Sequence, residues 1–309
     1  MERLDGGSAV PQTYRGGIVA LGNFDGFHRG HQAVVGRAVE RARAEGRPAL
    51  VATFDPHPMR FFKPDSPWFR LTTMAQRARL FAAGGIDAMF VFPFDAAFAQ
   101  VSATEFVADW LIGRLGAAGV VTGEDFTFGK GRTGDPQSMR RYGDEFGFSV
   151  SVAPAVENAG GKISSSAARE ALHYGRPETA AAILGRPFAI EGVVQKGRQL
   201  GRKLGFPTAN VPLADYVAPT FGVYATRTRL ADGRELPGVA NVGVNPTTGE
   251  VEPRLEVWLF DFDEDIYGET IETDLVAFLR PEEKFPSIEA MVDQIRIDAR
   301  RARDMLAAW

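Results

Sequence analysis

The spacing of apolar residues changes once along this 309-residue chain, and that change constrains the fold more than any other feature. Between residues 17 and 152, short apolar runs alternate with segments in which apolar residues recur at helical spacing. This alternation is typical of a parallel sheet with helices on both faces. We therefore expect a doubly wound α/β domain with strands at 18–21, 50–54, 89–92, 120–122 and 148–152 and helices at 31–44, 73–83, 104–115 and 139–145.

The later part of the chain carries a different pattern. Two short helical segments occupy residues 164–185, and strand-like segments separated by Gly and Pro follow them. Closely spaced strands of this kind predict a small antiparallel β-barrel. Ser287 is placed to cap a final helix, and a boundary near Arg186 gives domains of residues 1–186 and 187–309. The expected barrel strands are 189–195, 222–230, 239–244, 254–260 and 270–279, and the final helix carries Ile288, Met291, Val292 and Ile295 on one face.

The composition argues against several classes of function. The formal net charge is −4 and no long basic tract occurs, so a general nucleic-acid binder is not expected. The chain has no cysteine, which rules out a disulfide or a thiolate metal site and fits a reducing compartment. No run of about 18 apolar residues occurs, and the first residues lack the apolar core of a signal peptide. We therefore expect a cytoplasmic protein without a membrane span; the sequence predicts no oligomeric state.

NFDGFHRGHQ, residues 23–32, follows the first expected strand and contains His28 and His31. Ligands of open α/β sheets bind at the carboxyl ends of the strands, where this stretch lies. Gly22 and Gly30 allow the backbone to approach a ligand closely. The helix that begins near Gly30 directs N–H groups and its positive end at an anion. The stretch therefore predicts a phosphate site in which the two imidazoles donate to phosphate oxygens.

Two other interpretations of the histidine pair stay open. With His57 as a third ligand the pair could hold a metal ion, although zinc sites commonly add cysteine or a carboxylate. The pair could also be satisfied by hydrogen bonds at a helix start, with no ligand at all.

KISSSAAR, residues 162–169, places three hydroxyl groups at a helix N-terminus, and Arg169 follows them. Both kinds of group suit phosphates, and a serine that only caps the helix is the alternative. H-x-G-H after a first strand, together with this segment, resembles the nucleotidyltransferase superfamily, which transfers AMP or CMP from a nucleoside triphosphate. The resemblance implies that Ser165, Ser166 and Arg169 bind ATP phosphates, with Ser166 standing where the superfamily has threonine.

The stretch GRQLGRKLGFPTANV combines recurring glycines, among them Gly201, with the basic residues Arg202 and Lys203. We interpret it as a flexible basic loop over phosphates. Thr208 and Asn210 follow two residues apart, so on a strand both side chains lie on one face. Two neutral oxygens on one face suit a Mg²⁺ ion that also binds phosphates.

Glu256 breaks the apolar pattern of the segment LEVWLF. Such a carboxylate is either functional or a single residue in water on an edge strand. GFPTAN and its loop resemble the riboflavin kinase family, as do GVYA, ANVGVNPT, LEVWLFDFDEDIYGE and LRPEEKF. The resemblance implies a small barrel, with Thr208 and Asn210 contributing to Mg–ATP binding. It also implies that Glu256 is the catalytic base, which accepts the proton of a primary alcohol as that oxygen attacks the γ-phosphate.

The two sets of motifs occur in an order similar to that of the bacterial bifunctional riboflavin kinase/FAD synthetase family. This implies that the barrel phosphorylates riboflavin with ATP to give FMN. The first domain then transfers AMP from a second ATP to FMN, which gives FAD and pyrophosphate, and Mg²⁺ is the implied cofactor. Asp125, in VTGEDFTFGKGRTG, is expected to face the nucleotide. Phe62 and Phe128 are expected to stack on the flavin, although aromatic residues are also common in cores.

Other classes of function remain to be distinguished. An adenylyltransferase for another acceptor, such as nicotinate mononucleotide, leaves the PTAN half of the chain unexplained. A flavin-binding storage or regulatory protein keeps both pockets but does not need Glu256. A nucleic-acid-binding barrel fits the acidic balance least.

Overall fold

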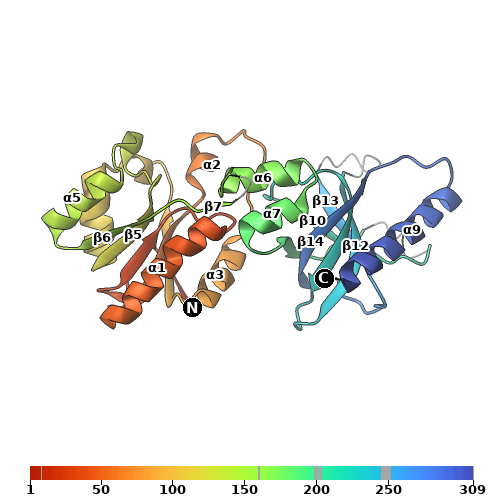
Figure 1. Cartoon of the computed structure of the whole chain (residues 1–309), viewed down its shortest axis with the longest axis horizontal. Coiled ribbons are helices and arrows are strands. Elements are labelled where there is room, and N and C mark those ends of the chain that lie inside the picture. Colours follow the sequence, from red (N-terminus) through yellow and green to blue (C-terminus); the bar gives the residue numbers. More distant parts are fainter. Residues whose placement is uncertain (8, 159–160, 198–200, 202–203, 245–251, 309) are drawn as a thin grey trace. The chain divides into compact units, whose positions relative to one another are not determined.

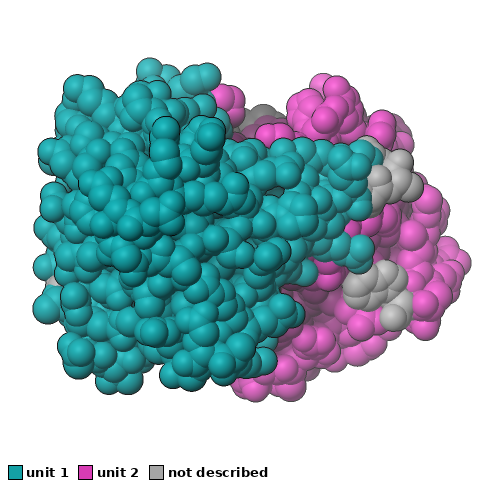
Figure 2. Space-filling view, turned by 60° about the vertical axis from the view of Figure 1, so that its left-hand side comes forward, with its two compact units in different colours: residues 1–66, 74–163 teal, residues 67–73, 164–309 magenta. Residues whose placement is uncertain are grey.

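The computed structural model describes residues 1–7, 9–158, 161–197, 201, 204–244 and 252–308. The chain divides into two compact units (Figure 2). The first unit comprises Met1–Ser66 and Met74–Ile163, and the second comprises Pro67–Thr73 and Ser164–Trp309. The short segment Pro67–Thr73 therefore packs with the later half of the chain, although the residues on both sides of it belong to the first unit.

The first unit, which carries the labels β5 and β6 in Figure 1, is built on a six-stranded sheet. Its strands follow the order β1-β4-β3-β2-β5-β6. Each neighbouring pair of strands is parallel, so the doubly wound sheet that we expected is confirmed. The central strand β2 is buried along its whole length because helices cover both faces. The strands are β1 Glu2–Asp5, β2 Ile18–Leu21, β3 Ala49–Asp55, β4 Ala88–Pro93, β5 Gly119–Gly123 and β6 Ser149–Ala153, followed by a small hairpin of β7 Glu157–Asn158 and β8 Gly161–Lys162.

The helices of the first unit form two apolar cores with the sheet. Helices α1 and α3 pack on one face, and η3 and α5 pack on the other. Helix α1 ends at Gly46, whose φ of 63° lies in the left-handed region that favours glycine. The helices are α1 Arg29–Glu45, α2 Pro58–Phe62, α3 Met74–Ala83, α4 Ala103–Glu105, η3 Phe106–Arg114 and α5 Pro136–Phe146, with short 3₁₀ turns η1 Gln12–Tyr14, η2 Phe98–Gln100 and η4 Lys130–Arg132.

Two elements of this unit differ from the prediction. The helix expected at 104–115 is a short α4, which starts with a capping box between Ser102 and Glu105, followed by the π-helix η3. The amide of Leu115 accordingly donates to the carbonyl of Trp110, five residues earlier, at 3.0 Å. Strand β1 was not predicted, because ERLD has three charged residues and lies at the edge of the sheet.

The second unit contains the predicted antiparallel barrel. Its six strands follow the order β10-β13-β12-β11-β14-β9, and a bridge between Gln195 and Asn210 joins the two ends of that order. The amide of Gln195 donates to the carbonyl of Asn210 at 2.8 Å across this junction. The strands are β9 Phe188–Val193, β10 Ala209–Pro212, β11 Gly222–Arg229, β12 Glu235–Gly243, β13 Arg254–Leu259 and β14 Thr270–Pro281.

Three helices accompany the barrel: α6 Ser165–His173, α7 Pro177–Leu184 and α9 Ile288–Ala307. The predicted cap of the last helix is confirmed, because the Ser287 hydroxyl accepts from the amide of Ala290 at 3.2 Å. Its apolar face is buried mainly toward the C-terminus, at Ala299, Ala302 and Leu306, whereas Ile288 is 56% exposed. Helix α7 contacts strands β9 and β14, so the structure places α6 and α7 with the barrel.

Candidate functional site

The first candidate site lies where the parallel sheet changes direction. From β2 the chain adds β3 and β4 on one side and then crosses to β5 on the other side of β2. Ligands of open α/β sheets bind at such a switch point, outside the carboxyl ends of the two central strands. Residues 22–32 follow the end of β2, and residues 124–129 follow the end of β5. The topology therefore places both predicted segments at the switch point.

The turn after β2 has an unusual backbone that buried polar groups support. Phe24, Gly26 and Phe27 have φ values of 52°, 81° and 42°. The carbonyl oxygen of Asn23 accepts two hydrogen bonds, from the hydroxyl of Thr53 at 2.9 Å and from the guanidinium of Arg77 at 3.0 Å. The Arg77 side chain is fully buried beneath the turn. These bonds fix the course of the chain into helix α1.

His28 caps helix α1 and is 7% exposed. Its Nδ1 accepts from the backbone amide of His31 at 3.2 Å, so in the neutral ring Nε2 carries the proton. The two imidazole rings stack with centroids 3.6 Å apart and planes inclined by 20°. The absence of a side chain at Gly30 leaves room for this pair, because a Cβ there would lie 3.0 Å from Cε1 of His28 and the ring would have to shift. The pair is thus organised at the N-terminus of a 17-residue helix, where backbone amides and the helix dipole favour an anion.

The metal interpretation of the histidines receives no support from the geometry. His57 caps a different helix, α2, where its Nδ1 accepts from the amide of Met59. Within the described residues no group of three or more His, Asp or Glu side chains is arranged to hold a metal ion.

Asp125 forms an ion pair with Lys162, with Nζ and Oδ2 3.0 Å apart. The hydrogen bond from this ammonium, and then the charge of Asp125, raise the pKa of Lys162. The sequence predicted a functional role for Asp125 but not for Lys162, although this lysine is the first residue of the KISSSAAR segment. Lys162 thus balances the negative charge of Asp125.

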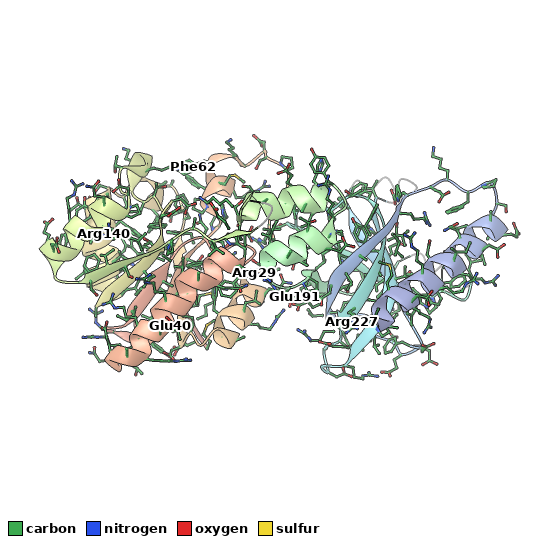
Figure 3. The ribbon with its side chains drawn as sticks, in the orientation of Figure 1. Arg29, Glu40, Phe62, Arg140, Glu191 and Arg227 are labelled. Carbon is green, nitrogen blue, oxygen red and sulfur yellow. The ribbon has the colours of Figure 1, made fainter. Side chains whose placement is uncertain are left out.

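The two aromatic residues predicted to stack on flavin lie in different environments. Phe62, on α2, is 63% exposed and labelled in Figure 3. Phe128 is 5% exposed within the apolar core, where its ring is parallel to that of Phe126. Phe62 can meet a ligand as it stands, whereas a contact between Phe128 and a flavin would need this loop to rearrange.

The serine segment belongs to the second unit. Ser164 caps α6 by accepting from the amide of Ala167 at 3.2 Å, and Ser165 and Ser166 form the first turn of that helix. Arg169, one turn further, donates from Nε to the carbonyl oxygen of Phe69 at 2.6 Å, and its guanidinium carbon lies 5.2 Å from the Phe69 ring centroid. The segment Pro67–Thr73 therefore holds Arg169, a contact that no local pattern indicated.

The second candidate site is on the barrel. Thr208 and Asn210 line one cavity of about 180 Å³, together with Pro207, Val257, Leu259 and the loop 262–267. The side-chain Nδ2 of Asn210 donates to the backbone carbonyl oxygen of Thr208 at 3.3 Å. Arg202 and Lys203 lie outside the described residues. Gly201 is described, and a Cβ there would overlap the carbonyl oxygen of Phe206.

Glu256 lies directly beside Asn210 on the neighbouring strand, because β10 and β13 pair Asn210 with Glu256. Strand β13 lies between β10 and β12, so the alternative of an edge strand is wrong. Leu255 and Val257, the neighbours of Glu256, are fully buried on the opposite face. Burial raises the pKa of Glu256; the charge of Arg254 opposes this and that of Glu282 adds to it. Because its pKa is raised, the Glu256 carboxylate binds a proton more readily than an exposed carboxylate does, which is the property that a general base needs.

The donor set near Asn210 is compatible with Mg²⁺. The Thr208 hydroxyl and the Asn210 amide supply neutral oxygens, and Mg²⁺ is usually held by few protein groups together with substrate phosphates and water. The cavity they share leaves room for those additional ligands.

The fold and the two residue sets define a two-domain, nucleotide-dependent transferase. Residues 10–167 match the family model of FAD synthetase, and residues 184–306 match that of riboflavin kinase. The chain belongs to the bifunctional riboflavin kinase/FMN adenylyltransferase family, with the FAD synthetase domain first and the riboflavin kinase domain second. The match over the barrel accounts for the PTAN half, which an adenylyltransferase for another acceptor left unexplained.

Relatives cover nearly the whole chain. The bifunctional riboflavin kinase/FMN adenylyltransferase of Escherichia coli (strain K12) is 39% identical over 297 residues, which cover 96% of this chain and 94% of that protein. The Pseudomonas fluorescens protein of the same name is 40% identical over 308 residues, 99% and 98% of the two chains. A solved structure described as a macrolide-efflux protein from Streptococcus pneumoniae superposes with a TM-score of 0.87 at 32% identity, covering 98% of this chain and 99% of that one. In the described part of the present chain, no helix is both long and apolar enough to cross a membrane.

Proposed function

We propose that the two activities of this bifunctional enzyme use the two residue sets described above. The observation that carries the proposal is the placement of Glu256, on the inner strand β13, beside Asn210 of β10. The histidine-capped helix α1 lies at the switch point of a separate sheet.

In the barrel, Glu256 accepts the proton of the primary alcohol of riboflavin. The alcohol oxygen attacks the γ-phosphorus of ATP, and the bond to the bridging oxygen breaks to release ADP and FMN. We assign phosphate binding to Gly201, Arg202 and Lys203, and Thr208 and Asn210 would hold the Mg²⁺ ion. Mg²⁺, when bound, neutralises the charge of the phosphates.

In the first domain, a phosphate oxygen of FMN attacks the α-phosphorus of a second ATP, and the bond to pyrophosphate breaks. Gly22 and Gly30 let the nucleotide approach the start of α1. His28 and His31 donate to the charge that develops between the α- and β-phosphates. In the same domain, Asp125 with Lys162 faces the nucleotide, and Phe62 stacks on the flavin. The family resemblance also assigns phosphate binding to Ser165, Ser166 and Arg169, which belong to the second unit. Phe128 remains a proposed flavin contact that requires loop movement.

The experiment is an incubation of the full chain with riboflavin, ATP and Mg²⁺, followed by chromatography. FMN should form first, and FAD should follow as FMN accumulates. Omission of Mg²⁺ should abolish the formation of both. Flavin binding without ATP turnover would contradict the proposal and support a storage or regulatory protein.

A further inference from the structure

Three polar side chains form a row across neighbouring strands of the barrel. Strand β13 pairs Glu256 with Asn210 of β10 on one side and with Asn241 of β12 on the other. Residues directly opposite each other in antiparallel strands have side chains on the same face, with Cβ atoms about 4.5–5.5 Å apart. Asn241 thus flanks Glu256 on one side, as Asn210 does on the other. The residues before and after it, Ala240 and Val242, are buried on the other face.

One hydrogen bond orients the side-chain amide of Asn241. Its Nδ2 donates to Oε1 of Glu282 at 3.1 Å. Gly243 leaves the room that this carboxylate needs, because a Cβ at that position would overlap Glu282. With the nitrogen directed at Glu282, Oδ1 lies on the other side of the amide group, where it can accept a hydrogen bond. Nothing in the proposed chemistry of the site uses this acceptor.

The direction of phosphoryl transfer points to its partner. The attacking and leaving oxygens lie on opposite sides of the transferred phosphorus. The nucleotide is on the Asn210 side of Glu256, so the carbon chain of the alcohol extends away from Asn210, toward Asn241. In riboflavin the carbon next to the reacting primary alcohol carries a secondary hydroxyl. That hydroxyl is on the next carbon of the ribityl chain, and Asn241 is the next residue after Glu256 in the row. The two groups therefore lie in the same direction from the reacting oxygen.

We propose that Oδ1 of Asn241 accepts a hydrogen bond from the secondary hydroxyl next to the reacting alcohol, and that this contact makes the kinase specific for a polyol chain bearing that hydroxyl. The inference rests on the proposed role of Glu256. A site built around a substrate hydroxyl disfavours an analogue that lacks it, because the acceptor then loses its donor.

The test compares two substrates of the full chain: riboflavin, and an analogue whose ribityl chain lacks only the hydroxyl next to the primary alcohol. With the unchanged chain, kcat/KM for phosphorylation should be about 10-fold lower or more for the analogue, the size expected for one hydrogen bond. In Asn241→Ala this preference should fall to near unity, because only the reaction with riboflavin loses a contact. The KM for ATP in the kinase reaction should stay the same, and an unchanged value also reports that the variant barrel is folded.

A matched variant separates binding from structure. Glu282→Gln retains an oxygen that accepts from Nδ2 of Asn241, so the preference for riboflavin should persist. Glu282→Ala removes that acceptor, and the preference should shrink. If Asn241→Ala lowers both reactions equally and the preference survives, Asn241 has only a structural role and the proposal is overturned. A separate assay tests the proposed role of Glu256: if Glu256→Gln still forms FMN at the normal rate, Glu256 is not the general base.

Discussion

Two contacts join His28 and His31: the backbone amide of His31 donates to Nδ1 of His28 at 3.2 Å, and the two rings stack with their centroids 3.6 Å apart. The first contact caps helix α1, and the second aligns two imidazoles at its positive end. A substitution at position 28 should therefore affect both the helix cap and the proposed chemistry, and matched variants can separate the two effects.

His28→Ala removes the cap and the Nε2–H donor. FAD formation from FMN should fall by roughly 10²–10³, the usual loss for one donor to developing charge, and the first unit should lose about 1 kcal/mol of stability. His28→Asn is the matched control, because asparagine caps helices well. It should restore most of the stability but not the rate. Steady-state rates and thermal melts provide the comparison; recovery of the full rate in the asparagine variant would show that His28 acts only as a cap.

The surroundings of Asp274 predict that the stability of the barrel depends on pH. Asp274 lies on β14, opposite Arg227 of β11 on one side and Ala189 of β9 on the other. On β14 and β9, Glu272 also lies opposite Glu191; Arg227 and Glu191 are labelled in Figure 3. Burial, followed by the charge of Glu272, raises the pKa of Asp274 from 3.8 to about 7, although Arg229 opposes this shift. The folded state thus retains a proton that the unfolded state releases, and stability falls as pH rises from about 4 to about 7.

Asp274→Asn should remove this dependence, since asparagine does not titrate. At pH 8 the variant should be more stable than the unchanged chain by up to about 4 kcal/mol, and the gain should vanish near pH 4. Denaturant titrations across this range measure the difference, and Asp293→Asn, at an exposed carboxylate of α9, controls for loss of charge. A difference that does not change with pH would mean that Asp274 titrates normally.

The boundary near Arg186 remains a prediction about catalysis. A fragment of residues 187–309 should convert riboflavin to FMN and form no FAD. A fragment of residues 164–309 should do the same but be more stable by roughly 2–5 kcal/mol, because α7 buries Ile183 and Leu184 within the barrel unit. Activity assays and urea unfolding of both fragments test this. Two folded fragments without kinase activity would show that the barrel depends on the first unit.

The alternation of strands and helices was readable in the sequence because it is a local property. The glycines and histidines after β2 could also be recognised from the sequence, because they lie within one short stretch that leads into helix α1. The partners of these groups were not readable. Lys162 meets Asp125, and Phe69 meets Arg169, across 37 and 100 residues. Asn241 and Glu256 are neighbours only in the observed strand register. Which residues face each other across strands depends on the whole sheet, and local patterns do not encode it.

The most direct test of two separate active sites is a reciprocal measurement on Glu256→Gln and His31→Ala. Each purified variant is assayed for FMN formation from riboflavin and for FAD formation from supplied FMN. Glu256→Gln should lose about 10²-fold or more of the first rate, the usual size of general-base loss, and keep the second. His31→Ala should keep the first rate and lose roughly 10²–10³ of the second. Equal loss of both rates in either variant would contradict the assignment of the two activities to two separate sites.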